Sequence, residues 1–517
     1  MVARVRTVAF QGIEAVPVDV QVVAGPGKMG MHIVGLADKA VAESRERVRS
    51  AIHASGLSMP TKRVVVNLAP ADLPKEGSHY DLAIALALMA TMGAVPAEKL
   101  EGYVVMGELA LDGTVAPVAG ALPAAMGANA MGRGLICPYP CGPEAAWADE
   151  AMDILAVRSL IQVANHFKGT QLLSRPVAST RGTDEALPDM ADIKGQESAK
   201  RALEVAAAGG HNLLMVGPPG AGKSMLAARL PSILPPLSTR ELLEVSTLRS
   251  VAGELAGQSE GGSRQVAMTS ARPFRAPHHS ASMAALVGGG QRARPGEVSL
   301  AHNGVLFLDE LPEFSPQVLD SLRQPLESGE TVIARANHRV TYPSRIQLVA
   351  AMNPCRCGHH GEPGHTCRRG ASCAADYQAR VSGPLMDRID LRIDVAALTA
   401  IELIQPAPSE GSATVRERVE RARAVQRERY GAMGEPGGTN AAASAAAIER
   451  AAEPDAGGLQ LLRDAAETMR FSARAYHRIL KVARTLADLD GQERVGRLHL
   501  AEAIASRTAG NRLLADA

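Results

Sequence analysis

Eight consecutive residues have the types and spacing that suit the binding of a nucleotide. They read Gly217-Pro218-Pro219-Gly220-Ala221-Gly222-Lys223-Ser224, which is the pattern G-x-x-x-x-G-K-[ST]. In such a loop the glycines let backbone N–H groups surround phosphate oxygens, the lysine contacts the β- and γ-phosphates, and the serine hydroxyl binds Mg²⁺. An apolar run precedes the loop and a helix-forming run follows it. The sequence therefore predicts a site for ATP and Mg²⁺ between a strand and a helix.

Two acidic residues follow a second apolar segment, 304–308. Asp309 is expected to hold Mg²⁺ through water, and Glu310 to polarise the water that attacks the γ-phosphate. A third apolar segment, 346–352, ends at Asn353, which would orient the same water. The alternatives are a surface Asp-Glu pair after a core strand, and an Asn-Pro pair that only ends a strand. In this order the residues predict hydrolysis of ATP and not binding alone.

Two arginines further along the chain have the positions of groups that act on a phosphate. Arg388 is expected to reach the γ-phosphate bound by a neighbouring subunit and to stabilise transition-state charge there. Its alternative role is a salt bridge to Asp387 or Asp390. Arg474 follows Ser472, a predicted helix N-cap, and is expected to contact the nucleotide of its own subunit. Its alternative role is that of an exposed helix arginine.

Four of the six cysteines fall in one stretch with three histidines between them. They are Cys355, Cys357, Cys367 and Cys373, in the spacing C-x-C-x9-C-x5-C. Four thiolates are able to close a tetrahedral zinc site, so the stretch predicts a structural Zn²⁺. The spacing is not the C-x2-C pair of ordinary zinc ribbons. A metal-free loop, reduced or redox-sensitive, is the alternative.

Composition limits the class of protein. The chain has 517 residues, which predicts several domains. Its 55 basic and 54 acidic residues almost cancel, so nucleic acid would have to bind a local basic patch. No apolar run reaches the roughly 18 residues that a membrane span needs. Six cysteines in so long a chain do not form a disulfide framework, and we expect a cytoplasmic protein.

The chain divides into three regions, and we expect an α/β multidomain fold. Residues 1–170 alternate strand and helix patterns, and a stretch at 171–189, rich in Ser, Thr, Gly and Pro, is typical of a linker. Residues 190–395 hold the phosphate loop and the groups that serve it. Residues 396–517 are rich in Ala, Arg and Glu at helical spacing and predict a C-terminal α-helical lid.

The ordered set of a phosphate loop, an acid pair, Asn353, Arg388 and Arg474 resembles the AAA+ ATPases. A segment inserted before the acid pair, and a β-hairpin at 331–342, are similar to the branch that holds magnesium-chelatase subunits and MCM helicases. Further motifs resemble the bacterial magnesium-chelatase-like family along almost the whole chain; they are 272–279, 288–290, 295–304 and 351–355.

This resemblance implies a homohexamer that hydrolyses ATP and moves DNA. It implies a helicase that promotes branch migration in natural transformation and homologous recombination, on single-stranded or branched DNA of any sequence. The hairpin tip is basic, and its residues are expected to contact DNA phosphates; they are Arg335, Asn337, His338 and Arg339. A solvated basic turn is the alternative for the tip. A chelatase-type motor subunit and an ATP-dependent protease remain the alternatives for the whole protein.

The N-terminal region resembles the Lon-type Ser/Lys protease domain, which is an α+β fold. The resemblance places the nucleophile at His79 and the general base at Leu122, neither of which has the required chemistry. We therefore expect a catalytically inactive, protease-derived scaffold. Ser78 with Lys75 is the remaining pair that would allow proteolysis.

Overall fold

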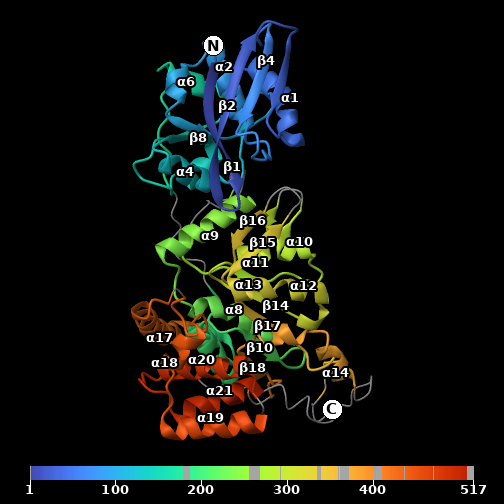
Figure 1. Ribbon diagram of the computed structural model, residues 1–517, viewed down its shortest axis with the longest axis vertical. Coiled ribbons are helices and arrows are strands. Elements are labelled where there is room, and N and C mark those ends of the chain that lie inside the picture. The colour runs from blue at the N-terminus through green and yellow to red at the C-terminus, as the bar shows by residue number, and fades with distance from the viewer. Residues whose placement is uncertain are drawn as a thin grey trace.

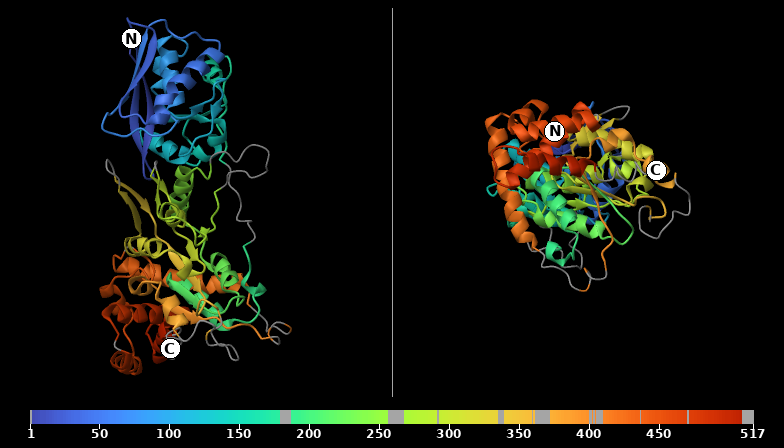
Figure 2. Two further views of the ribbon diagram at one scale, coloured as in Figure 1. Left: turned by 90° about the vertical axis from the view of Figure 1, so that its right-hand side faces the viewer. Right: turned by 90° about the horizontal axis from the view of Figure 1, so that it is seen from below.

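Three parts follow one another along the long axis of the computed structural model (Figure 1). A mixed α/β domain lies at one end, a second α/β domain lies in the middle, and a group of helices lies at the other end (Figures 1 and 2). The structure describes residues 2–178, 187–255, 268–290, 293–334, 339–358, 360, 372–399, 402, 404, 410–435, 437–469 and 471–508. The expected α/β multidomain class is confirmed at this level.

The N-terminal domain is built on a mixed seven-stranded sheet with the order β3-β4-β2-β1-β5-β8-β9. Strands β1, β2 and β4 pair antiparallel, whereas β5, β8 and β9 are parallel. Helix α2 is buried on all sides, in keeping with a sequence that is apolar all round. The strands are β1 (Val2–Gln11), β2 (Glu14–Gly25), β3 (Gly30–Val34), β4 (Arg63–Ala69), β5 (Tyr103–Val105), β6 (Glu108–Leu109), β7 (Val115–Ala116), β8 (Gly134–Pro138) and β9 (Ile154–Val157). The helices are α1 (Lys39–Ala54), α2 (Asp81–Thr91), α3 (Ala97–Leu100), α4 (Ala121–Ala130), α5 (Gly142–Ala145) and α6 (Leu160–Phe167).

The central domain is built on a five-stranded sheet with the order β11-β14-β17-β10-β18, in which every neighbouring pair is parallel. Parallel strands present their carboxyl ends at one edge, where ligands bind in α/β sheets. The segments predicted from the apolar runs form three adjacent strands, so the residues after them share that edge. The strands are β10 (Leu213–Val216), β11 (Phe274–Arg275), β14 (Val305–Leu308), β17 (Gln347–Met352) and β18 (Leu391–Asp394). The larger helices are α7 (Glu197–Gly209), α8 (Lys223–Ile233) and α9 (Thr239–Ala252), and the shorter ones include α12 (Pro316–Ser321), α13 (Arg323–Ser328), α14 (Cys373–Gln378) and α15 (Gly383–Met386).

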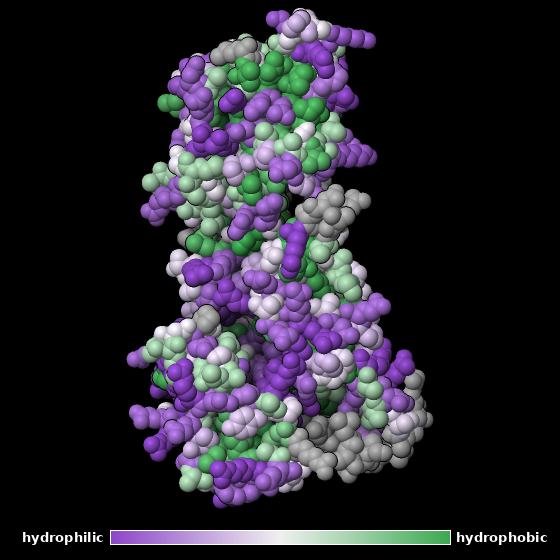
Figure 3. All heavy atoms as spheres, viewed as in Figure 1, coloured by the Kyte–Doolittle hydropathy of each residue, from purple (hydrophilic) through white to green (hydrophobic). Residues whose placement is uncertain are grey.

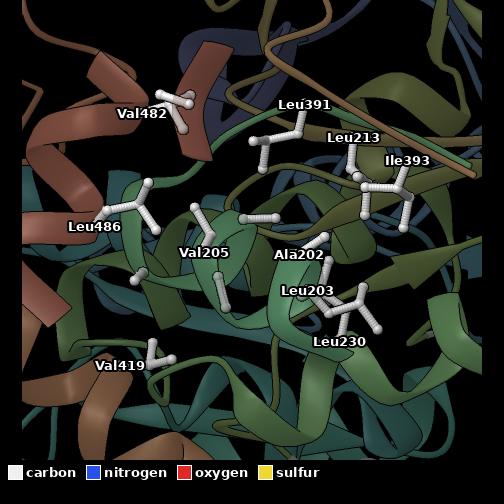
Figure 4. Packing of buried hydrophobic residues seen from close by; sticks show 14 of the residues in the cluster. Ala202, Leu203, Val205, Leu213, Leu230, Leu391, Ile393, Val419, Val482 and Leu486 are labelled. Carbon is white, nitrogen blue, oxygen red and sulfur yellow. The ribbon is translucent and has the colours of Figure 1, made fainter. Parts of the chain in front are cut away.

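The C-terminal helices pack against the central domain through one shared apolar core. Figure 4 shows Val482 and Leu486 facing Val205 on α7, with Val419 and Leu230 nearby. The predicted N-cap at Ser472 is confirmed, because its side chain accepts from the backbone N–H of the third helical residue of α20. The helices are α17 (Ser412–Ala432), α18 (Ala445–Ala451), α19 (Ala456–Met469), α20 (Ala473–Leu489) and α21 (Arg497–Thr508). Hydrophilic residues cover much of the visible face of these two lower parts (Figure 3). Among the described helices, none has the length and apolar character needed to cross a membrane.

The predicted hairpin is formed by β15 (Glu330–Ala334) and β16 (Arg339–Pro343), and the N-terminal domain rests on it. Ile13, in the turn between β1 and β2, packs on an apolar cluster that includes Ile333, Val340 and Tyr342. At Gly12 a Cβ would lie 2.6 Å from the carbonyl oxygen on β16, so only glycine fits there. The N-terminal domain therefore touches the same hairpin that the sequence assigns to DNA.

A buried carboxyl on α5 lies at a further contact between these domains, where α4 meets α9. Glu144 is 2 % exposed and accepts from the backbone N–H of Leu122 at 3.1 Å. Burial raises the pKa of Glu144 to about 7, and hydrogen bonds from Ser250 and Leu122 lower it only in part. In the folded chain the Glu144 carboxylic acid therefore keeps its proton at pH values below about 7.

Stability is expected to fall as the pH rises because of Glu144. In an unfolded chain this group ionises above about 4.5, whereas in the folded chain it keeps its proton up to about 7. The contribution of Glu144 to the free energy of unfolding is thus complete at low pH. Roughly 3 kcal/mol of this contribution is lost as the pH rises from 4.5 through about 7. Thermal unfolding between pH 5 and 8 should show the Glu144→Gln variant gaining stability relative to the parent as the pH rises. Parallel curves for the two proteins would contradict this prediction.

Candidate nucleotide-binding site

The loop 217–224 connects β10 to α8 at the carboxyl edge of the sheet, as predicted. Gly220 and Gly222 have φ angles of +81° and +88°, a region that favours glycine. A side chain at Gly217 would collide with the carbonyl of Val395, where the chain leaves β18. The glycines therefore meet local backbone needs, and they leave the N–H groups at the start of α8 available to an anion.

Lys223 is the first residue of α8 and points back into the loop. Its Nζ donates to the carbonyl oxygens of Gly217 at 2.7 Å and Pro218 at 2.8 Å. It also donates to Oδ1 of Asn353 at 3.1 Å, so these two predicted residues lie together. The side chain is 8 % exposed. A buried ammonium group held only by neutral oxygens suits an anionic ligand such as a phosphate.

The acid pair lies beside the start of the same helix. Ser224 Oγ donates to Oδ2 of Asp309 at 2.6 Å, which brings together the hydroxyl and the carboxylate expected to serve Mg²⁺. These oxygen donors fit the ion, because Mg²⁺ prefers hard oxygen ligands. Burial lowers the pKa of Lys223, and the charges of Asp309 and Glu310 raise it in part.

Glu310 has an unusual backbone. Its φ is +51°, in the left-handed region that residues other than glycine enter at a cost. Its N–H donates to Oδ1 of Asp309 at 2.9 Å. Local strain of this kind is concentrated at functional sites, where it aims a side chain. The carboxylate is 51 % exposed, so it is open to solvent water at this edge.

His279 was not predicted to belong to this site. Its Nδ1 lies 3.4 Å from Oε2 of Glu310. His278 and His279 follow β11, and the structure pairs β11 with β14 in parallel. The loop after β11 therefore had to end near the acid pair.

Arg388 and Arg474 line one cavity of about 190 Å³, and none of its lining residues belongs to the loop 217–224 or the acid pair. Arg388 is 8 % exposed and donates to the carbonyl of Pro384 at 2.7 Å and to the carboxylate of Glu327. Arg474 is exposed. The lining residues are Leu326, Glu327, Asp387, Arg388, Ala445, Arg474, His477, Arg478 and Lys481. Arg474, expected to serve its own subunit's nucleotide, thus lies beside the arginine expected to serve a neighbour's.

Two further cationic side chains that the sequence analysis did not assign to the site, Arg478 and Lys481, line this cavity. Arg478 pairs with the carboxylate of Asp390; burial raises the pKa of Asp390, but Arg478 and His211 hold it well below its usual range. Burial lowers the pKa of Lys481. Arg474, Arg478 and Lys481 are spaced by four and three residues, which places them on one face of α20. That spacing was visible in the sequence.

The cysteine stretch is described in part. Cys355 and Cys357 have their sulfur atoms 2.9 Å apart, and Cys373 lies in the same buried cluster. Cys367 lies outside the described residues. Within the part of the chain that is described, no three His, Cys, Asp or Glu side chains are close enough to hold a metal ion. The thiols that are described therefore do not form a complete zinc site by themselves.

At the hairpin tip, where the sequence predicts contacts with DNA, the structure describes Arg339. Arg335, Asn337 and His338 lie outside the described residues. Arg339 begins β16 and lines a cavity of about 310 Å³ between the hairpin and the N-terminal domain. Glu76 and Glu108 line the same cavity. Arg339 therefore lies within the same cavity wall as two acidic residues of the N-terminal domain.

Ser78 and Lys75, the pair that the sequence analysis left as able to allow proteolysis, make separate hydrogen bonds. Ser78 donates to the carboxylate of Glu108, and Lys75, fully buried, donates to the carbonyl of Pro70. His79 Nε2 donates to the carbonyl of a β1 residue at 2.8 Å. Ser78 and Lys75 are therefore each engaged with a different partner.

Comparison with known proteins gives the relationship. Three stretches match families described as "Subunit ChlI of Mg-chelatase" (18–140), "Magnesium chelatase, subunit ChlI" (189–403) and "Magnesium chelatase, subunit ChlI C-terminal" (409–507). The protein YifB of Salmonella typhimurium is 42% identical over 506 residues, covering 98% of this chain and 97% of that protein. The chain belongs to the magnesium-chelatase ChlI-like family, with relatives of the YifB and ComM type.

The family membership makes the chain an AAA+ ATPase and implies ATP and Mg²⁺ as its ligands. Other members of the ChlI-like family match to different extents. Competence protein ComM of Haemophilus influenzae is 43% identical over 507 residues, covering 96% of each chain. The magnesium-chelatase 38 kDa subunit of Rhodobacter capsulatus is 28% identical over 189 residues, covering 35% of this chain and 54% of that protein. Similarity to the ComM type thus extends over nearly the full length.

Proposed function

We propose that this protein is an ATP-driven DNA motor that works as a ring of six identical subunits and promotes branch migration. One observation carries the proposal. Lys223, Ser224, Asp309 and Asn353 meet at one edge of the sheet, whereas Arg388 lines a separate cavity. One chain therefore holds half of a hydrolytic site, and a neighbouring subunit supplies the other half.

Each residue of the first half has a distinct task. Bound ATP and Mg²⁺ supply the phosphoanhydride bond and the charge that balances it. Lys223 exchanges its carbonyl contacts for phosphate oxygens, and the loop N–H groups donate to the same anion. Glu310 polarises a water molecule, and Asn353 orients it by the amide that now accepts from Lys223. These residues would bind the nucleotide and position a water molecule for attack on the γ-phosphate.

The second half is the cavity beside α20. Arg388, Arg474, Arg478 and Lys481 bring four cationic side chains to its wall, against the two acids Glu327 and Asp387. Such a surface favours the phosphates of a neighbouring subunit's nucleotide. We therefore assign Arg474 to the neighbour's site together with Arg388. Charge supplied in this way stabilises a phosphoryl-transfer transition state by about 10³-fold or more in rate.

The assignment to DNA has two supports. The full-length relative ComM is named a competence protein, and competence is the uptake of DNA by bacteria. The hairpin β15–β16 carries a basic tip, which in a ring would face the central channel and contact phosphates of any sequence. The chelatase alternative has less support, because the 38 kDa chelatase subunit matches about a third of the chain.

We also propose that a structural Zn²⁺ is held by Cys355, Cys357, Cys367 and Cys373. Purified protein is then expected to carry about one zinc ion per chain, as in a site with four thiolates. Elemental analysis should show the metal lost in the Cys355→Ser variant. The Cys141→Ala variant, which changes a buried thiol of the N-terminal domain, is the matched control and should retain it. Zinc-free parent protein would contradict the proposal.

The rate of ATP hydrolysis with and without DNA tests the proposed function. We expect single-stranded or branched DNA to raise the rate, and the effect to weaken as salt rises, because phosphate contacts are electrostatic. Arg339→Glu should weaken the stimulation more than Arg45→Glu, a charge reversal on the exposed face of α1. A rate that DNA leaves unchanged at low salt would contradict the motor.

A further inference from the structure

We propose that Cys355 and Cys357 form a thiol switch on the phosphate loop: their oxidation to a disulfide stops ATP hydrolysis, and reduction restores it. The proposal rests on the proposed ATPase function and adds regulation to that site. It concerns two described thiols and needs no contribution from Cys367.

The two sulfur atoms are placed to react with each other. They lie 2.9 Å apart, within about 1 Å of the roughly 2.05 Å bond length of a disulfide. Cys355 is fully buried, whereas Cys357 is partly exposed. Oxidation follows exposure, so Cys357 is the thiol that an oxidant in solution reaches first, and Cys355 is the one that resolves it.

The pair is connected to the nucleotide site at both ends of a short segment. Two residues before Cys355 lies Asn353, whose Oδ1 accepts from Lys223 at 3.1 Å. Directly after Cys357 lies Gly358, with φ +90°; a Cβ on it would lie 2.7 Å from Cδ of Pro219. The backbone of Gly358 therefore rests on the phosphate loop itself. A change in the backbone between Asn353 and Gly358 cannot leave both contacts in place.

A third connection runs through the helix α14, which begins at Cys373 and packs in the same cluster. Gln378 on this helix donates to the carbonyl of Pro354 at 3.0 Å. Tyr377 is buried, and the charges of Glu313 and Glu310 help to raise its pKa to about 12. The helix thus joins the cysteine segment to the surroundings of the acid pair.

The chemistry balances with a hydroperoxide as the oxidant. The Cys357 thiolate attacks the O–O bond of H₂O₂; the thiol becomes a sulfenic acid and one water leaves. The Cys355 thiolate then attacks that sulfur, the S–S bond forms, and the hydroxyl leaves as a second water with the proton of the second thiol. Two thiols are oxidised and one peroxide is reduced. A dithiol reductant reverses the step by thiol–disulfide exchange.

The disulfide is expected to change the backbone conformation around residues 355–357 because the covalent ring that it closes is small. It closes over a single intervening residue, so the backbone of 355–357 must turn to accept it. Gly358 and Asn353 then move relative to Pro219 and Lys223, and closely packed interiors transmit such shifts. Misplacement by about 1 Å costs on the order of 10²-fold in rate. We expect hydrolysis to slow by at least about 10-fold on oxidation.

The test compares ATP turnover by the full-length protein before and after treatment with H₂O₂, and again after dithiothreitol. Peptide mass spectrometry reports whether the Cys355–Cys357 disulfide has formed. The expected result is disulfide formation, a fall in rate of about 10-fold or more, and recovery on reduction. In the Cys357→Ser variant the ratio of the two rates should stay near one. Cys141→Ala should remain as sensitive as the parent.

Three results would overturn the switch: no disulfide between these cysteines, a disulfide without a change in rate, or equal sensitivity in Cys357→Ser. The Zn²⁺ proposed for these cysteines protects their thiols from oxidation, so the metal is measured in the same samples and removed by a chelator before peroxide is added. Reduced protein that hydrolyses no ATP contradicts the proposed function instead. In that case the switch is tested by the affinity for a fluorescent ATP analogue, which is measured before and after peroxide treatment and should change on oxidation.

Discussion

Replacement of Lys223 by alanine is expected to abolish ATP turnover. The ammonium group is the buried cation of the loop, held by two carbonyls and by Asn353, and no other described lysine or arginine side chain donates to these loop carbonyls. Removal of one preorganised charge at a developing phosphate charge costs about 10²–10³-fold in rate. Steady-state ATPase measurements give the loss. Lys28→Ala, at an exposed position between β2 and β3, is the matched control and should keep the parent rate.

Glu310→Gln separates binding from hydrolysis at the same site. The amide keeps the size of the side chain but cannot accept a proton from water, so the rate should fall about 10²–10⁴-fold. Affinity for ATP should remain, since Lys223 and Ser224 are intact. Hydrolysis at half the parent rate by either Lys223→Ala or Glu310→Gln would contradict the assignment of these residues to the hydrolytic site.

Arg388→Ala is expected to lose turnover for a different reason, because in the proposed ring Arg388 serves the nucleotide of another subunit. The loss of such an arginine costs about 10³-fold or more. The discriminating measurement mixes Arg388→Ala with Lys223→Ala subunits. In a mixed ring an Arg388→Ala subunit supplies an intact loop and a Lys223→Ala neighbour supplies the arginine, so about a quarter of the interfaces are complete. Turnover should therefore return on mixing, although each variant is inactive alone.

The same mixing decides the role of Arg474. If it serves the neighbour, as its cavity suggests, Arg474→Ala regains activity with Lys223→Ala and gains nothing with Arg388→Ala. If it serves its own subunit, the pattern is reversed. Arg323→Ala, an exposed arginine on α13, is the control and should be active alone. Failure of Arg388→Ala and Lys223→Ala to complement, with both folded, would contradict the shared site.

Much of the first half-site was predictable because it depends on local sequence. Short apolar runs predicted β10, β14 and β17, and parallel pairing of such strands leaves the residues after them at one edge. Lys223, Asp309 and Asn353 therefore met where the order of motifs required. His279 was not predicted to belong to the site. Its residue type was suitable, but the sequence did not show that β11, the strand before it, pairs with β14.

The second half-site depends on how the C-terminal helices pack, which local patterns do not determine. The helix α20 was predicted to begin near Ser472, and it does. Its orientation is set by distant contacts, among them Arg478 with Asp390 and the core around Val482. These contacts bring Arg474 to Arg388, a proximity that a single sequence could not reveal. The hairpin tip and Cys367 stay predictions, since they lie outside the described residues.

The most direct test of the account is the movement of a labelled four-way DNA junction by the purified protein with ATP and Mg²⁺. The account predicts that the parent protein separates the junction into its duplex products in a reaction that requires ATP hydrolysis. The Lys223→Ala and Glu310→Gln variants should leave the junction intact under the same conditions. A parent protein that hydrolyses ATP but leaves the junction intact, at low salt and with excess protein, would contradict the proposal that this ATPase is a branch-migration motor.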